Sequence, residues 1–131
     1  MIEATVKKIM FTGINKYAKS MLVAPEQVQI KVTNDENGTV FYEICNNFKV
    51  VEKVSFLNIM DKKMDLLGYE SMSSPFMKKS LLACAKDNDA DISDVSVFIL
   101  KHGENIGLAF YNKFKNIKTI PLSKHLEGIG F

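Results

Sequence analysis

The sequence predicts an α+β fold with a mainly antiparallel sheet, formed by a single domain over residues 1–131. Three observations lead to this prediction: apolar residues at helical spacing near the N-terminus, two separate series of strands and turns, and a helical segment between them. With 131 residues, 47% of them hydrophobic, the chain can bury a core without metal or disulfide support. The expected order is an N-terminal amphipathic helix, an antiparallel meander, a central helical segment and a second antiparallel meander.

The first element is an amphipathic helix over residues 2 to about 21. Its apolar stripe recurs at helical spacing and comprises Ile2, Val6, Ile9, Met10, Gly13 and Tyr17. Glycine inside a helix costs about 1 kcal/mol relative to alanine. Gly13 therefore predicts either a close packing contact or a break in the helix.

The first meander follows from alternation of apolar and polar residues over residues 28–33, a turn composition at 34–38 and an apolar, aromatic run at 40–44. Residues 48–54 extend it as a third strand. Between residues 54 and 68 the pattern fits either a strand or a helix, because short apolar runs do not distinguish the two.

The second half begins with a helix that starts at Ser73-Ser74-Pro75, where serine can cap and proline suits the first turn, and ends near Asp87. Residues 95–100 are apolar on both faces, as in a central strand. Residues 106–111 return after a turn, and residues 117–122 form the last strand before a tail too short for a long helix.

A faint repeat links the two meanders. Phe41-Tyr42 and Asn47-Phe48-Lys49 resemble Phe110-Tyr111 and Lys113-Phe114-Lys115, with spacings that differ by a residue or more. Ancient duplication of a helix and a meander explains this echo, and so does chance similarity between two hairpins.

All 17 basic residues are lysine, and they exceed the 15 acidic residues by only two. This charge alone does not indicate a nucleic-acid or membrane partner. The absence of arginine removes the side chain that grips phosphate bidentately and reads guanine edges. We favour the simple interpretation that an AT-rich genome, of a low-GC virus, bacteriophage or bacterium, encodes its basic residues as lysine.

Cys45 and Cys84 lie far apart in the sequence, and the N-terminus has no recognisable secretory signal. The longest apolar runs are far shorter than the roughly 20 residues that span a bilayer. We therefore expect free thiols, a reducing environment in the cytoplasm or a virion, and no membrane partner.

No metal site or cofactor is predicted. The alternate carboxylates from Asp87 to Asp94 resemble the start of a calcium loop, but Ile92 replaces the required glycine and Phe98 the required glutamate, so we favour a solvated loop. The two histidines, His102 and His125, and the two cysteines lack zinc-site spacing. Because no catalytic motif is present either, we expect no enzymatic activity and assign no catalytic residue.

A first candidate contact surface is the predicted helix start at Ser74 with Lys78 and Lys79. Lysines in the first turn oppose the helix dipole, and the free backbone N–H groups there can receive an anion or an acidic partner. Ordinary surface tolerance explains the same charges, because salt screens them.

A second candidate surface joins an aromatic ring to lysines. If the strand from Ile106 continued through Lys115, it would place Tyr111, Lys113 and Lys115 on one face, with Lys118 nearby. Single-strand nucleic-acid binders combine lysines and rings in this way. The lysines of a protected sheet edge look the same, and we favour that simpler interpretation.

The leading hypothesis for function is a non-enzymatic protein–protein interaction or assembly module that binds a protein partner or a second copy of itself as a homo-oligomer, for instance as a structural protein of a virion. The alternative is a sequence-tolerant nucleic-acid-binding protein that uses lysines and an aromatic ring on a sheet face.

Overall fold

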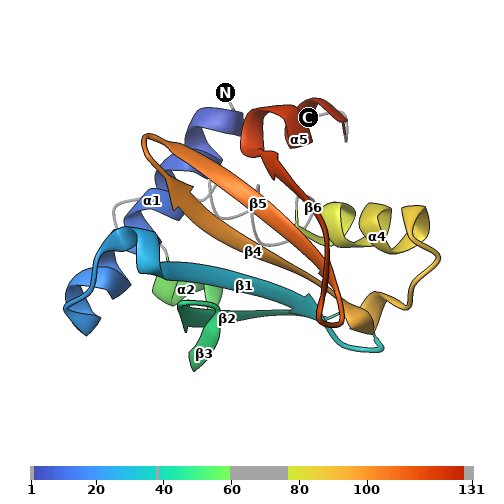
Figure 1. Ribbon diagram of the computed structural model, residues 1–131, viewed down its shortest axis with the longest axis horizontal. Coiled ribbons are helices and arrows are strands. Elements are labelled where there is room, and N and C mark those ends of the chain that lie inside the picture. The colour runs from blue at the N-terminus through green and yellow to red at the C-terminus, as the bar shows by residue number, and fades with distance from the viewer. Residues whose placement is uncertain (1, 38, 60–76, 129–131) are drawn as a thin grey trace.

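The computed structural model describes residues 2–37, 39–59 and 77–128 (Figure 1). In chain order the helices are α1 (Ile2–Met21), the short 3-10 helix η1 (Pro25–Gln27), α2 (Phe56–Ile59), α4 (Met77–Asp87), the 3-10 helix η3 (Ile92–Asp94) and α5 (Leu122–Gly128). The strands are β1 (Val28–Asn34), β2 (Val40–Asn46), β3 (Lys49–Val54), β4 (Val95–His102), β5 (Asn105–Asn112) and β6 (Lys115–Pro121).

The six strands form one sheet in the order β3-β2-β1-β4-β5-β6, and every neighbouring pair is antiparallel. Each meander supplies three adjacent strands, and the sheet is joined at its centre by the pairing of β1 with β4. The predicted α+β fold with an antiparallel sheet is confirmed.

One side of the sheet, the helix face, packs against the helices. In Figure 1 strands β4 and β5 pass in front of α1. Val28, Ile30 and Val32 of β1 are fully buried on this face, together with Ile14 of α1 and Leu81 of α4. Each such side chain stabilises the fold by about 1.5–3 kcal/mol relative to an exposed one, so this layer holds the two halves together.

The opposite side is the open face, which carries the alternate residues of each strand. Lys31 of β1, Phe98 of β4, Ala109 of β5 and Thr119 of β6 form one row across it. Among the described residues, a small second cluster forms on this face around Cys45, Phe98 and Ala109.

Most predicted elements are confirmed, including the helix over residues 2–21 and the central strand from Val95. The third strand begins at Lys49 because Phe48 has a left-handed backbone conformation (φ 67°) that belongs to the turn. The last strand begins at Lys115, two residues earlier than predicted. The segment after residue 54 is helical over Phe56–Ile59, and its residues 60–68 lie outside the described residues.

The two halves of the chain repeat the same backbone plan. Tyr42 pairs with Val54 in the first half and Leu108 with Ile120 in the second, an offset of 66 for both partners. This offset holds for the whole of both hairpins, including a bulge after Ile44 and after Phe110. A bulge is a specific local irregularity, so its repetition at matched positions shows that the halves are structural counterparts.

The turns that lead into each half match as well. The N–H of Val23 donates to the carbonyl of Ala18 at 3.0 Å, and the N–H of Ala90 donates to the carbonyl of Ala85 at 2.9 Å, an offset of 67. At this offset Lys31 and Phe98 are counterparts, and they are also paired across β1 and β4. A pseudo-twofold axis therefore passes between Lys31 and Phe98.

The repeat predicted from the sequence is confirmed for one pair of segments and is wrong for the other. Asn47-Phe48-Lys49 and Lys113-Phe114-Lys115 are structural counterparts. Phe41-Tyr42 corresponds to Gly107-Leu108 and not to Phe110-Tyr111, because the register of the hairpins, rather than the presence of rings, sets the correspondence.

Candidate interaction surface

The open face has an aromatic cluster beside the pseudo-twofold axis. The ring of Phe98 lies edge-on to Phe48 (centroids 5.2 Å apart) and to Tyr111 (5.3 Å). The ammonium group of Lys31 lies 5.5 Å from the centroid of the Phe98 ring. These contacts leave Phe98 only 7% exposed. Each edge-to-face pair adds about 0.5–1.5 kcal/mol, so the cluster fixes the middle of the face.

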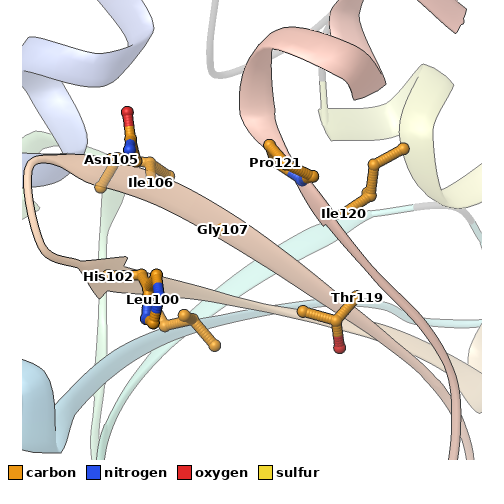
Figure 2. A pocket seen from close by; sticks show the side chains of 8 residues that line it. All are labelled: Leu100, His102, Asn105, Ile106, Gly107, Thr119, Ile120 and Pro121. Carbon is orange, nitrogen blue, oxygen red and sulfur yellow. The ribbon is translucent and has the colours of Figure 1, made fainter.

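A hollow of about 280 Å³, which we call the Gly107 hollow, lies where β4, β5 and β6 run side by side (Figure 2). Leu100, Gly107 and Pro121 are cross-strand neighbours there. Figure 2 shows Leu100 and Thr119 on either side of the bare ribbon at Gly107. His102 and Asn105 complete the lining at one end. The hollow is thus mainly apolar with a few polar groups at its rim.

The counterpart of this hollow in the first half is lined by an aromatic ring. The residue that corresponds to Gly107 is Phe41, and the residue that corresponds to Thr119 is Lys53. The ammonium group of Lys53 lies 3.9 Å from the centroid of the Phe41 ring, and both residues line a hollow of about 560 Å³. The first half therefore carries its own ring at this position, whereas the second half has no side chain there.

A third hollow of about 290 Å³, the axis hollow, lies between Lys31, Asp94, Lys113 and Phe114. Phe114 is fully exposed, with a relative exposure of 101%.

The counterpart of Phe114, Phe48, is held in two ways that Phe114 lacks. The N–H of Phe48 donates to Oε1 of Gln29 at 2.8 Å, and its ring packs on Phe98. At the corresponding positions of the second half stand Ser96, which is shorter than glutamine, and Lys31, which has no ring. The second half thus offers Phe114 neither contact.

The predicted lysine and tyrosine strip is not arranged as expected. Tyr111 lies on the open face against Phe98. The chain turns at Lys113, which has a positive φ of 55°, and Lys115 already begins the next strand. Lys118 pairs with Phe110, whose ring belongs to the helix-face core and lies 5.1 Å from the Lys118 ammonium group. The prediction of one continuous face is wrong, because a turn separates Tyr111 from Lys115.

The other predicted surfaces are partly described. Ser74 lies outside the described residues, whereas Lys78 and Lys79 are exposed at the start of α4. Asp87 ends α4, and the following aspartates occupy the loop before β4. No group of three or more histidine, cysteine or carboxylate side chains gathers within the described part of the chain in a way that could hold a metal ion.

A buried Ser80–His125 pair is a polar arrangement that sequence reasoning missed. Nε2 of His125 lies 2.8 Å from Oγ of Ser80, and both side chains are buried between α4 and α5. Burial, assisted by the charge of Lys118, lowers the pKa of His125 to about 4. A serine beside a histidine can act as a nucleophile, but a substrate cannot reach this pair, so we interpret it as structural. Nothing in the sequence links residues 45 positions apart.

The two cysteines give a direct test of the core. Cys45 and Cys84 are free and buried, and burial raises the pKa of Cys45 to about 11 and also raises that of Cys84. Because the thiolate is the reactive form, we expect Cys45 to react at least about 100-fold more slowly than an ordinary thiol. Titration with a thiol reagent should find both thiols only after denaturation. Rapid reaction of either thiol in the native protein would contradict this packing.

No helix in the described segments is long and apolar enough to cross a membrane. Comparison of the chain with known protein families, curated proteins and solved structures finds no match.

Proposed function

We propose that the protein is a non-enzymatic protein–protein interaction module whose open face receives an aromatic side chain of a protein partner in the Gly107 hollow. The observation that carries the proposal is the correspondence of Gly107 with Phe41. The first half of the same fold has a phenylalanine ring at this position. The second half has the same backbone arrangement there, but glycine leaves the place of the ring empty.

The size and lining of the hollow suit an aromatic ring. Its volume of about 280 Å³ exceeds the roughly 150 Å³ of an apolar cavity that holds benzene. Leu100 and Pro121 give it apolar side chains on the open face, while His102 and Asn105 stand at one end. Aromatic anchors in such apolar depressions dominate the energy of many protein interfaces.

The experiment is a titration followed by NMR of the backbone amides and the methyl groups. N-acetyl-phenylalanine amide at millimolar concentration should shift the methyl signals of Leu100 and Thr119 and the backbone amide signal of Gly107, which lie on the open face, and N-acetyl-alanine amide should not. In the variant Gly107→Phe these shifts should disappear, because the new ring occupies the hollow. The substitution can be accommodated, since its Cβ would lie 3.2 Å from Cδ1 of Leu100, the end of a flexible side chain.

The matched control is Gly128→Ala, which changes a glycine that has open space around it. This variant should keep the shifts. The proposal is wrong if the aromatic probe produces no shifts around Gly107, or if Gly107→Phe leaves them unchanged.

A second candidate function is sequence-tolerant nucleic-acid binding, favoured by the two lysines, Lys31 and Lys113, that line the axis hollow on the open face. The packing of Tyr111 and Phe98 weighs against it, because two rings in edge-to-face contact present less free surface for bases to stack on. Gel filtration with a mixed oligonucleotide separates the two functions: co-elution at low salt that disappears at higher salt would support nucleic-acid binding.

A further inference from the structure

We propose that the partner is a second copy of this chain, and that the side chain it inserts into the Gly107 hollow is Phe114. This inference rests on the proposed function, which supplies the hollow as a receptor for a ring. It adds the identity of the partner and the symmetry of the contact.

Phe114 is the described aromatic residue with the greatest exposure, 101% against 49% for its counterpart Phe48. A fully exposed phenylalanine leaves its whole ring in water, which costs about 1.5–3 kcal/mol relative to burial. Phe114 lines the axis hollow together with Lys31 and Ser96 of the open face, so it lies at the edge of the same side of the sheet as Leu100 and Pro121.

Phe114 cannot fill the hollow of its own chain. It lies in the turn that follows Asn112, whereas Gly107 and Pro121 lie near the other end of the β5–β6 hairpin (Figure 1). The antiparallel ladder between these strands keeps the two ends apart. A Phe114 ring that fills this hollow therefore comes from another molecule.

The position of the two features on one hairpin fits a closed dimer. A twofold axis that lies between two facing hairpins, across the middle of the strands, places the turn of each copy over the far end of the other. Each Phe114 then enters the hollow of its partner, and the two contacts are identical. Such reciprocal contacts close a dimer and cover both Phe114 rings and both Gly107 hollows.

The charges around the two features are complementary. Lys113 and Lys115 flank Phe114 on both sides and are exposed. The turn beside the hollow carries the exposed Glu104, between the rim residues His102 and Asn105. When Phe114 enters the hollow, its two flanking ammonium groups approach this carboxylate, so charge steers the rings toward the correct end of the partner.

The test measures molecular mass by light scattering and affinity by sedimentation equilibrium. We expect the unmodified protein to form a dimer and Phe114→Ala to weaken it by about 30-fold or more, as for other central anchors. Gly107→Phe should weaken it similarly. Leu82→Ala removes another exposed apolar side chain, on α4, and should leave the dimer intact.

Charge exchange tests the orientation of the contact. Glu104→Lys alone should weaken the dimer, and adding Lys113→Glu with Lys115→Glu should restore it, because the signs at both ends are then reversed. A monomeric unmodified protein, a dimer unaffected by Phe114→Ala, or a triple variant that is not restored each overturns this inference. Failure of the proposed function is seen separately, as the absence of NMR shifts when N-acetyl-phenylalanine amide is added to the Phe114→Ala variant, in which no Phe114 ring competes for the hollow.

Discussion

Acidification from pH 7 to pH 4 is expected to lower the free energy of unfolding by about 3 kcal/mol through His125 alone. Burial lowers the pKa of this imidazole from 6.5 to about 4 in the folded protein. In the unfolded chain the ring takes up a proton near pH 6.5. Between these two values the unfolded state binds more protons than the folded state, so stability falls as the pH falls from 6.5 to 4.

The environment of His125 explains the size of the effect. Its ring is 4% exposed, lies 5.1 Å from the ring of Phe110 and shares a 2.8 Å hydrogen bond with Ser80. Loss of hydration is the main penalty on the charged form, and the positive charge of Lys118 adds to it. The neutral imidazole keeps its hydrogen bond to Ser80 and avoids both the loss of hydration and the repulsion from Lys118.

Urea unfolding at a series of pH values measures this contribution. The structural counterparts of Ser80 and His125 are Gly13 and Ile59, which make an apolar contact at the same place in the first half. The double variant Ser80→Ala with His125→Ile should therefore fold and lose the His125 part of the pH dependence. The variant Gly128→Ala, which removes no titratable group and has open space around it, should leave the slope as it is. Equal slopes in the double variant and the unmodified protein would falsify this account.

Local patterns in the sequence were enough to predict most elements of the fold, although not the short helix α5. The helix at residues 2–21 and the strand from Val95 were predictable because the spacing of apolar residues within each segment is enough to indicate its type. The order of the strands in the sheet, with β1 beside β4, depends on contacts between halves that lie far apart in the chain. Residue alternation and turn residues predicted two meanders, but they did not predict which strands of the two meanders pair with each other.

The candidate surface was less predictable, because it depends on register. A comparison of aromatic residues in the sequence aligned Phe41 with Phe110, whereas the hairpins align it with Gly107. Because the two alignments differ by three residues, the sequence comparison does not reveal that Gly107 stands where the first half has a phenylalanine. It therefore does not predict the hollow either. The sequence also led us to expect Lys115 on the same strand as Tyr111. Nothing in the run of lysines shows that a turn begins at Lys113.

Gly13→Leu is expected to destabilise the protein by about 3 kcal/mol, although leucine is the better helix former by nearly 1 kcal/mol. Gly13 lies in the buried stripe of α1, where the sequence predicted a close contact or a break, and the helix is unbroken. A Cβ at this position would lie 2.6 Å from Cγ2 of Ile59 and 3.3 Å from Cδ1 of Ile30. Both isoleucines are fully buried, so neither has free space to move into.

A graded series separates this contact from helix propensity. Gly13→Ala should cost less than leucine but still destabilise, whereas Gly128→Ala, in α5 and with open space around it, should be neutral or slightly stabilising. Removing Cγ2 with Ile59→Ala should reduce the cost of Gly13→Ala in a double-mutant cycle, because the clashing atom is then gone. If Gly13→Ala and Gly128→Ala changed the free energy of unfolding equally, helix propensity would be the whole effect. The close approach of α1 to α2 would then not explain why the first half has a glycine at position 13. At the corresponding position the second half has Ser80, which is hydrogen-bonded to His125.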